Sequence, residues 1–260
     1  MKFITTLLAL IFISINLFAQ EETVQIQHEG NQRSFIIYSP CQTYNCTGKL
    51  LPVVFAFHGL GQSSVSIRDY SLFNNIADTA GFVLIYPQGV NNGWNVGFDI
   101  ANPTTTNDVD FTETIIKHLR NNMTNCAGQI CPNIDTNQIF ACGLSNGGFM
   151  SYQLACNLTH RIKAMASVAG SMTKTMYNNC NPTRSVPLLE IHGDADIVVP
   201  YTGSSLSGAK AIPDVIDFWL ANNNCSSSPS IFNFPDINTA DNSTVTSYSY
   251  KPCNNSEVLL

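Results

Sequence analysis

The chain has 260 residues, of which 44% are hydrophobic and only 12% are charged, and its formal net charge is −6 at pH 7. A general nucleic-acid-binding protein would carry a clustered basic face, so this composition argues against that class. The low charge also argues against a disordered chain, and the length is enough for one large buried core.

Residues 1–19 have the build of a secretory signal peptide. Lys2 gives a short basic start, an apolar stretch follows at 7–18, and the small residue Ala19 precedes a polar segment. We expect cleavage after Ala19 and a single domain over residues 20–260. A transmembrane anchor is the alternative, but the stretch is short for a full span and polar residues interrupt it.

Export implies an oxidising compartment, and the nine cysteines fit one. Two Cys-x4-Cys spacings predict short loops closed by disulfides, namely Cys41 with Cys46 and Cys126 with Cys131. For the longer bridges we expect Cys156 with Cys180 and Cys225 with Cys253, although spacing alone does not fix connectivity. Cys142 is left as a buried free thiol. Zinc ligation is the alternative, but the spacings differ from those of the usual zinc sites.

Short apolar runs alternate with helical periodicity along the chain. Segments 22–27 and 33–38 flank a Gly-Asn turn and predict an antiparallel hairpin. Continuous apolar runs predict buried strands at 51–57, 82–86, 139–142, 164–168 and 188–191. Helical periodicity lies at 67–79, 110–121, 147–157 and 213–222. This alternation predicts an α/β fold with a mostly parallel sheet, and a polar excursion near the end with one more strand near Tyr248.

The end of the run 139–142 carries the nucleophile candidate. The motif Gly143-Leu144-Ser145-Asn146-Gly147 lies between a predicted strand and a predicted helix. A sharp turn there would expose the Ser145 hydroxyl near the positive end of the helix, with the N–H of Asn146 pointing at the developing oxyanion. The bare pattern is common, and a glycine-rich turn in which Ser145 only caps the helix is the alternative.

The end of the run 51–57 carries a second oxyanion candidate. The turn His58-Gly59-Leu60-Gly61 follows that strand, and its glycines let a backbone N–H, that of Leu60, face the site. We expect His58 to be structural. A plain loop is the alternative.

The end of the run 188–191 carries two acids, Asp194 and Asp196. An acid at this position could orient a histidine and stabilise it when protonated. Asp196 is the preferred candidate because it has room to reach across the strand ends. Asp194 is the alternative, although its position suits a turn.

Together these motifs, with Tyr86-Pro87-Gln88-Gly89 and Asn107-Asp108-Val109-Asp110-Phe111, make the chain resemble the α/β-hydrolase superfamily. More narrowly, it resembles secreted esterases of the polyhydroxybutyrate-depolymerase and feruloyl-esterase group (carbohydrate esterase family 1-like). The resemblance implies a mostly parallel sheet with helices on both faces. It also implies Ser145 as nucleophile, Asp196 as the triad acid, and no metal or organic cofactor.

The triad histidine is the departure from that group, where it follows the acid along the chain. All five histidines precede Asp196, namely His28, His58, His118, His160 and His192. Residues 257–260 resemble the start of the strand that carries the histidine loop. We therefore expect a fragment that lacks the last strand and this loop and is nearly inactive as it stands. A product that has lost catalysis is the alternative.

The resemblance implies a secreted serine esterase acting on feruloyl or acetyl esters of plant polysaccharide, with a short-chain polyester as the alternative substrate. Trp94 follows the turn at 86–89 and could stack on a sugar or aromatic ring, or it could be half-buried packing. The missing histidine keeps a non-catalytic glycan-binding module open, and a peptidase on the same fold is a third interpretation. We expect an ester substrate on polysaccharide or polyester as partner, with no nucleic acid and, after leader cleavage, no membrane.

Overall fold

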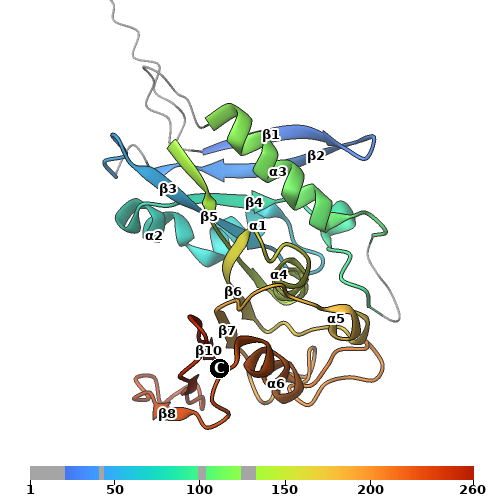
Figure 1. Ribbon diagram of the computed structural model, residues 1–260, viewed down its shortest axis with the longest axis vertical. Coiled ribbons are helices and arrows are strands. Elements are labelled where there is room, and N and C mark those ends of the chain that lie inside the picture. Colours follow the sequence, from blue (N-terminus) through green and yellow to red (C-terminus); the bar gives the residue numbers. More distant parts are fainter. Residues whose placement is uncertain (1–20, 41–43, 99–103, 124–132) are drawn as a thin grey trace, which may run out of the picture.

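The computed structural model describes residues 21–40, 44–98, 104–123 and 133–260. These residues form one ten-stranded sheet in the order β1-β2-β4-β3-β5-β6-β7-β10-β9-β8, which runs from the top to the bottom of Figure 1. The predicted leader, 1–19, lies outside the described residues.

The strands are β1 (Glu21–His28), β2 (Asn31–Tyr38), β3 (Leu50–Phe57), β4 (Val83–Pro87), β5 (Asn133–Leu144), β6 (Ile162–Val168), β7 (Leu188–Ile191), β8 (Ser230–Asn233), β9 (Thr246–Tyr250) and β10 (Val258–Leu259). The helices are α1 (Ser64–Ser71), α2 (Phe73–Ala80), α3 (Asp108–Met123), α4 (Asn146–Asn157), α5 (Lys174–Asn179) and α6 (Ile212–Asn223), with a 3-10 turn η2 (Val90–Asn92).

The centre of the sheet is parallel. Strands β4, β3, β5, β6, β7 and β10 pair in parallel, whereas β1 and β2 form an antiparallel hairpin on β4, and β9 and β8 pair antiparallel at the other edge. The predicted α/β fold with an N-terminal hairpin is therefore confirmed. Because the carboxyl ends of parallel strands meet at one edge, the loops after β3, β5, β6 and β7 come together there.

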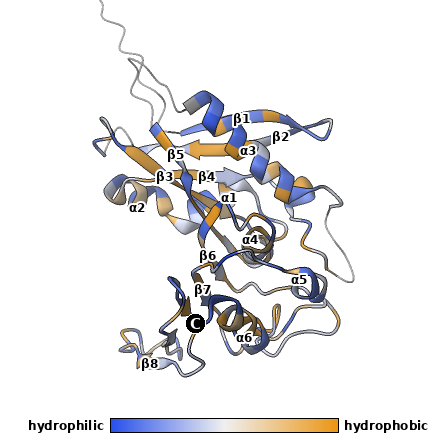
Figure 2. Cartoon of the chain, in the orientation of Figure 1, coloured by the Kyte–Doolittle hydropathy of each residue, from blue (hydrophilic) through white to orange (hydrophobic). Residues whose placement is uncertain are grey.

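Helices cover both faces of the sheet. Helices α3 and α4 pack on β5, whereas α1 packs on β3 and β4 and α2 packs on β4. The larger core includes Phe55, Phe149 and Trp219, and a smaller one includes Ala77 and Tyr86. In Figure 2 the apolar colour is concentrated in the central strands, whereas α3 alternates between polar and apolar residues. This pattern is expected of buried parallel strands and amphipathic helices.

The predicted helix at 67–79 is two helices. Leu72 has φ 54° and ψ 22°, so it leaves the helical region and separates α1 from α2. Helix α1 begins with a reciprocal capping box between Ser63 and Ser66, which satisfies backbone N–H groups at its start. The sequence pattern did not separate the two helices because the apolar spacing continues across the break. Helix α5 and strand β8 were not predicted either.

Both long disulfides are as expected. Cys156 bonds Cys180, and Cys225 bonds Cys253. Cys142 is a free thiol, as predicted, and burial raises its pKa to about 12. Cys46 is disulfide-bonded, but the other three cysteines of the predicted short loops, Cys41, Cys126 and Cys131, lie outside the described residues. In the part of the chain that the structure describes, no helix has the length and apolar character to cross a membrane.

Candidate active site

Ser145 lies between the end of β5 and the start of α4, in the turn that the motif predicts. Its backbone has φ 54° and ψ −120°, a conformation that a residue with a side chain rarely adopts. The N–H of Ser145 donates to the carbonyl of Val168 at the end of β6, at 2.8 Å, which holds the turn against the sheet. The strained geometry expected of a nucleophile turn is therefore present at this serine.

The glycines on either side of Ser145 are required by close backbone approach. A Cβ on Gly143 would lie 2.2 Å from the carbonyl oxygen of Gly147. A Cβ on Gly147 would lie 2.1 Å from the carbonyl oxygen of Phe57. Both distances are far inside van der Waals contact. The two glycines thus allow the backbone of α4 to contact the backbones of β5 and β3 next to Ser145.

Ser145 is half-buried at the N-cap position of α4, and its hydroxyl makes no hydrogen bond that caps the helix. The interpretation of Ser145 as a simple helix cap is therefore wrong. The N–H of Asn146 is the first of α4, and the first N–H groups of a helix have no partner within it. These groups and the helix dipole place partial positive charge beside the hydroxyl.

The loop after β3 leaves one N–H unused. The N–H of Gly59 donates to Gln62 Oε1, that of Gly61 donates to the Asn92 carbonyl, and that of Gln62 donates to the Gly59 carbonyl. The N–H of Leu60 has no partner among the described residues. Leu60 is therefore the residue of this loop with a backbone donor available for an oxyanion.

Trp94 ties the two oxyanion segments together. Its backbone N–H donates to Asn146 Oδ1 at 2.7 Å, and Asn146 Nδ2 donates back to its carbonyl at 3.3 Å. Its indole Nε1–H donates to the carbonyl of His58 at 2.8 Å. The side chain is fully buried, with its ring edge-on to Phe57. Of the two interpretations of Trp94, its complete burial supports packing and contradicts stacking on a substrate.

His58 is structural, as its place in the turn suggested. Its Nδ1–H donates to the Gly59 carbonyl at 2.8 Å, and its Nε2 accepts from the N–H of Gly89 at 3.0 Å. These bonds fix the neutral form, and burial also lowers its pKa. The imidazole thereby joins the turn after β3 to the turn after β4.

Asp196 lies in the loop after β7 with one carboxylate oxygen engaged. Oδ1 accepts from the N–H groups of Val198 and Val199, at 2.8 and 3.0 Å. Oδ2 has no hydrogen bond within the described residues and lies 3.8 Å from His192 Nε2, and the side chain is 19% exposed. Asp196 is thus held by its own loop and keeps an oxygen free for an acceptor role. Asp194 is exposed.

His192 lies close to Asp196, but both of its ring nitrogens are occupied. Nε2 donates to the Val199 carbonyl at 2.7 Å, and Nδ1 contacts Glu190 Oε1 at 3.0 Å. Burial lowers the pKa of His192, but the bonds to Glu190 and Val199 outweigh it and leave the pKa above its usual value. His192 therefore supports the acid loop and has no nitrogen free to act as a base.

Glu190 was not singled out by the sequence analysis. It is fully buried in β7, and its Oε2 accepts from the hydroxyl of Tyr152 on α4 at 2.7 Å. The chain Tyr152–Glu190–His192 connects the helix that carries Ser145 to the loop that carries Asp196. Its signal was an acid within an apolar strand, which is rare unless that acid has a partner.

The other three histidines lie elsewhere. His28 contacts the start of α3, His118 lies on α3 edge-on to Phe35, and His160 is exposed after α4. Within the described ranges, no group of three or more His, Cys, Asp or Glu side chains is placed to hold a metal ion.

The sequence was compared with those of known protein families. The family model described as phospholipase/carboxylesterase (Abhydrolase_2) matches residues 45–217. The chain belongs to this family. It is 32% identical over 160 residues to the putative esterase NocK of Nocardia uniformis subsp. tsuyamanensis, which covers 61% of the chain and 44% of that protein. It is 29% identical over 205 residues to the probable feruloyl esterase C of Aspergillus flavus, which covers 76% of the chain and 64% of that protein. The chain thus spans less than two thirds of the length of these relatives.

Solved structures share the fold. A thermostable esterase superposes with a TM-score of 0.59 at 17% identity, covering 78% of this chain and 52% of that one. An S-formylglutathione hydrolase from Agrobacterium tumefaciens superposes with a TM-score of 0.54 at 15% identity, covering 80% and 85%. The predicted α/β-hydrolase fold is confirmed. The narrower grouping with polyhydroxybutyrate depolymerases stays a prediction.

Proposed function

We propose that this protein is a serine esterase that hydrolyses carboxylic esters, with Ser145 as its nucleophile and Asp196 as the acid of its triad. The observation that carries the proposal is the strained backbone of Ser145 at the start of α4, together with a hydroxyl that makes no capping hydrogen bond to the helix. Family membership supports the reaction class.

In this proposal Ser145 Oγ attacks the ester carbonyl and its proton passes to a histidine base. The carbonyl oxygen becomes an oxyanion that the N–H groups of Leu60 and Asn146 stabilise. The base then protonates the leaving alcohol, and water attacks the acyl-enzyme to release the acid and restore Ser145. No cofactor takes part.

The base is the part of this mechanism that the described residues do not supply, because both nitrogens of His192 and of His58 are occupied. The expectation that a histidine follows Leu260 remains a prediction. The unoccupied Asp196 Oδ2 is the atom that would accept its Nδ1–H and hold it in the required tautomer.

We propose that the substrate is a feruloyl or acetyl ester of plant polysaccharide. The acyl group is then apolar. Exposed apolar side chains stand at the strand ends that surround Ser145, namely Leu60, Val168, Ile191, Ile197 and Val198. Relatives named as feruloyl esterases and as a bifunctional acetylxylan esterase/xylanase support this choice. A hydroxybutyrate polyester is the alternative substrate. The disulfides Cys156–Cys180 and Cys225–Cys253 support secretion.

The test begins with the gene sequence after the codon for Leu260, followed by assays of the complete product. We expect a glycine-flanked histidine in the continued reading frame and hydrolysis of methyl ferulate. Ser145→Ala should reduce kcat/KM by roughly a thousandfold or more. If the protein hydrolyses a hydroxybutyrate oligomer but not methyl ferulate, the substrate is a polyester. Full activity in the Ser145 variant would overturn the proposal.

A non-catalytic glycan-binding protein is the second candidate, because the two histidines at the described strand ends, His58 and His192, have both ring nitrogens occupied. A stop codon directly after Leu260, together with glycan binding and no ester hydrolysis, would favour it over the esterase.

A further inference from the structure

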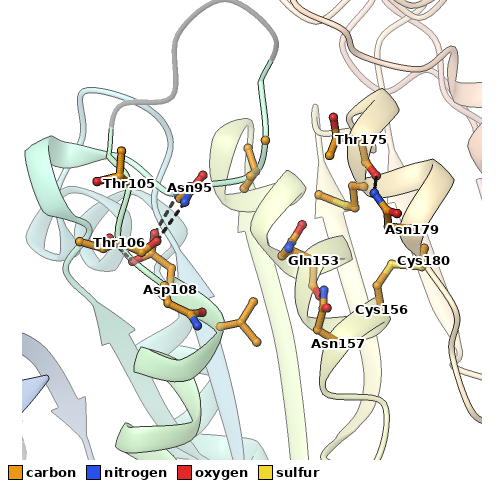
Figure 3. A pocket seen from close by; sticks show the side chains of 15 residues that line it. Asn95, Thr105, Thr106, Asp108, Gln153, Cys156, Asn157, Thr175, Asn179 and Cys180 are labelled. Atoms are coloured by element: carbon orange, nitrogen blue, oxygen red, sulfur yellow. Dashed lines mark hydrogen bonds between the residues drawn. A yellow bond between two sulfur atoms is a disulfide. The ribbon is translucent and has the colours of Figure 1, made fainter. Parts of the chain in front are cut away.

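A cleft of about 310 Å³ lies away from Ser145, between the segments around residues 95–97 and 105–109, helix α4 and helix α5 (Figure 3). Neither the proposed reaction nor the family match gives it a role. Its lining comes from these four segments of the chain.

The cleft offers amides and hydroxyls and no free charge. Asp108 is the only charged residue among those that line it. Its Oδ1 is paired with Arg33 Nη2 at 2.9 Å, and its Oδ2 accepts from the N–H of Asn95 at 2.8 Å. Because this carboxylate is buried and already partnered, the cleft favours a neutral ligand over an ion.

Three amides of the cleft keep unused hydrogen-bonding groups. Asn157 Nδ2 donates to the Gln153 carbonyl on α4, and Asn179 Nδ2 donates to the Thr175 carbonyl on α5, both at 2.8 Å. Each asparagine thus keeps its side-chain oxygen and one N–H, and the Gln153 amide has no partner within the described residues. Figure 3 shows Gln153 and Asn157 on α4, with Asp108 on one side of them and Asn179 on the other.

Apolar residues complete the lining. Val109 is partly exposed, whereas Val96 and Met176 are buried beneath the amides, and the disulfide Cys156–Cys180 ties α4 to α5 at one end. Fixed walls reduce the entropy that binding costs, because the site is formed before the ligand arrives.

We propose that this cleft binds a neutral polyhydroxylated ligand, namely a sugar unit of an oligosaccharide. Hydroxyl groups both donate and accept hydrogen bonds, and the free amide groups offer both partners. The C–H face of a pyranose would pack on the partly exposed Val109. The absence of free charge in the lining disfavours phosphates and carboxylates.

The cleft is separate from the reaction centre. Gln153 follows Ser145 by eight positions on α4, which corresponds to about 12 Å along the helix axis. An oligosaccharide esterified on one sugar could therefore reach both places. Binding in the cleft does not depend on catalysis at Ser145, so the two proposals fail separately.

The test is direct titration of the complete protein with unesterified xylohexaose and cellohexaose by calorimetry, with protein made in a host that does not glycosylate it. The choice of these sugars rests on the proposed polysaccharide substrate. We expect binding of at least one. Gln153→Ala and Asn179→Ala should each weaken that binding roughly three- to tenfold, which is the effect of one lost hydrogen bond.

Asn122→Ala is the matched control. Asn122 is an exposed asparagine on α3 whose Nδ2 donates to the His118 carbonyl at 2.8 Å, as Asn157 and Asn179 do on their helices, but it does not line the cleft. The Asn122→Ala variant should bind the sugar with the same affinity as the wild type. Binding of neither sugar, or equal affinity in all variants, would overturn the inference. Hydrolysis of methyl ferulate by the same samples tests the esterase proposal independently.

Discussion

The backbone N–H of Trp94 donates to Asn146 Oδ1 at 2.7 Å, across 52 positions of sequence. Since the indole of Trp94 also bonds the carbonyl of His58, one buried residue joins the loop of Leu60 to the start of α4, through its side chain on one side and its backbone on the other. The two proposed oxyanion donors come from different strands, and their separation must be fixed for both to reach one oxygen atom. Trp94 is therefore a positioning residue and not a surface for substrate.

Trp94→Phe tests this role. The change keeps an aromatic ring but removes the indole bond to His58, so the Leu60 N–H should lose its precise placement. We expect kcat to fall roughly tenfold in the active full-length enzyme, with little change in KM, because removal of a whole oxyanion donor costs about a hundred- to a thousandfold. Steady-state kinetics on methyl ferulate measure it.

Trp219→Phe is the control for that experiment. Trp219 is also fully buried, but its Nε1 has no hydrogen-bond partner within the described residues. It should lower the melting temperature without the fall in kcat. Equal kcat losses in the two variants would contradict a positioning role for Trp94.

Gly147→Ala should be far more damaging than its size suggests. The added Cβ would lie 2.1 Å from the Phe57 carbonyl oxygen, so β3 and α4 would have to separate. Overpacking of this kind typically costs about 1–3 kcal/mol, and we expect the free energy of unfolding, measured by urea denaturation, to fall by at least about 2 kcal/mol.

Gly193→Ala is the comparison, because nothing lies within 4 Å of a Cβ built at Gly193 in another strand-end loop. It should change the free energy of unfolding by less than about 0.5 kcal/mol. Similar losses at both positions would show that the close approach behind Ser145 does not constrain the fold.

Local chemistry explains what the sequence predicted correctly. The turn at Ser145 depends on neighbouring glycines, and buried parallel strands leave continuous apolar runs, so both are visible in a single segment. The burial of Trp94 depends on its bonds to Asn146 and His58, which only the folded sheet brings together. Glu190 was missed for the same reason, because its partner Tyr152 lies 38 positions away. The amide-lined cleft forms only when its four segments have packed together.

The raised pKa of His192 predicts a pH-dependent stability. A histidine whose folded pKa lies above its unfolded value stabilises the fold fully below the unfolded pKa of about 6.5, and this contribution is lost as pH rises through the folded pKa. The melting temperature should therefore fall as pH rises from about 6.5 through the folded pKa, and His192→Gln should make the melting temperature depend less on pH. A profile for His192→Gln parallel to that of the wild type would exclude this contribution.

The contribution of His118 to stability has the opposite pH dependence, because burial lowers its pKa. Protonation of His118 at low pH therefore destabilises the fold, and His118→Gln should reduce the fall in melting temperature on acidification.

The disulfide Cys156–Cys180 should stabilise the fold chiefly by restricting the unfolded chain. It closes a segment of sequence separation 24, for which chain entropy predicts about 3.5 kcal/mol. The double variant Cys156→Ala/Cys180→Ala should show that loss in urea denaturation under oxidising conditions. Cys142→Ala controls for removal of a buried sulfur without a bridge, because Cys142 is a free thiol. If the double variant unfolds within about 0.5 kcal/mol of this control, the bridge adds no restriction beyond the packing of α4 and α5. A larger loss would show that the wall between these helices, which also bounds the amide-lined cleft, is held by the covalent bond.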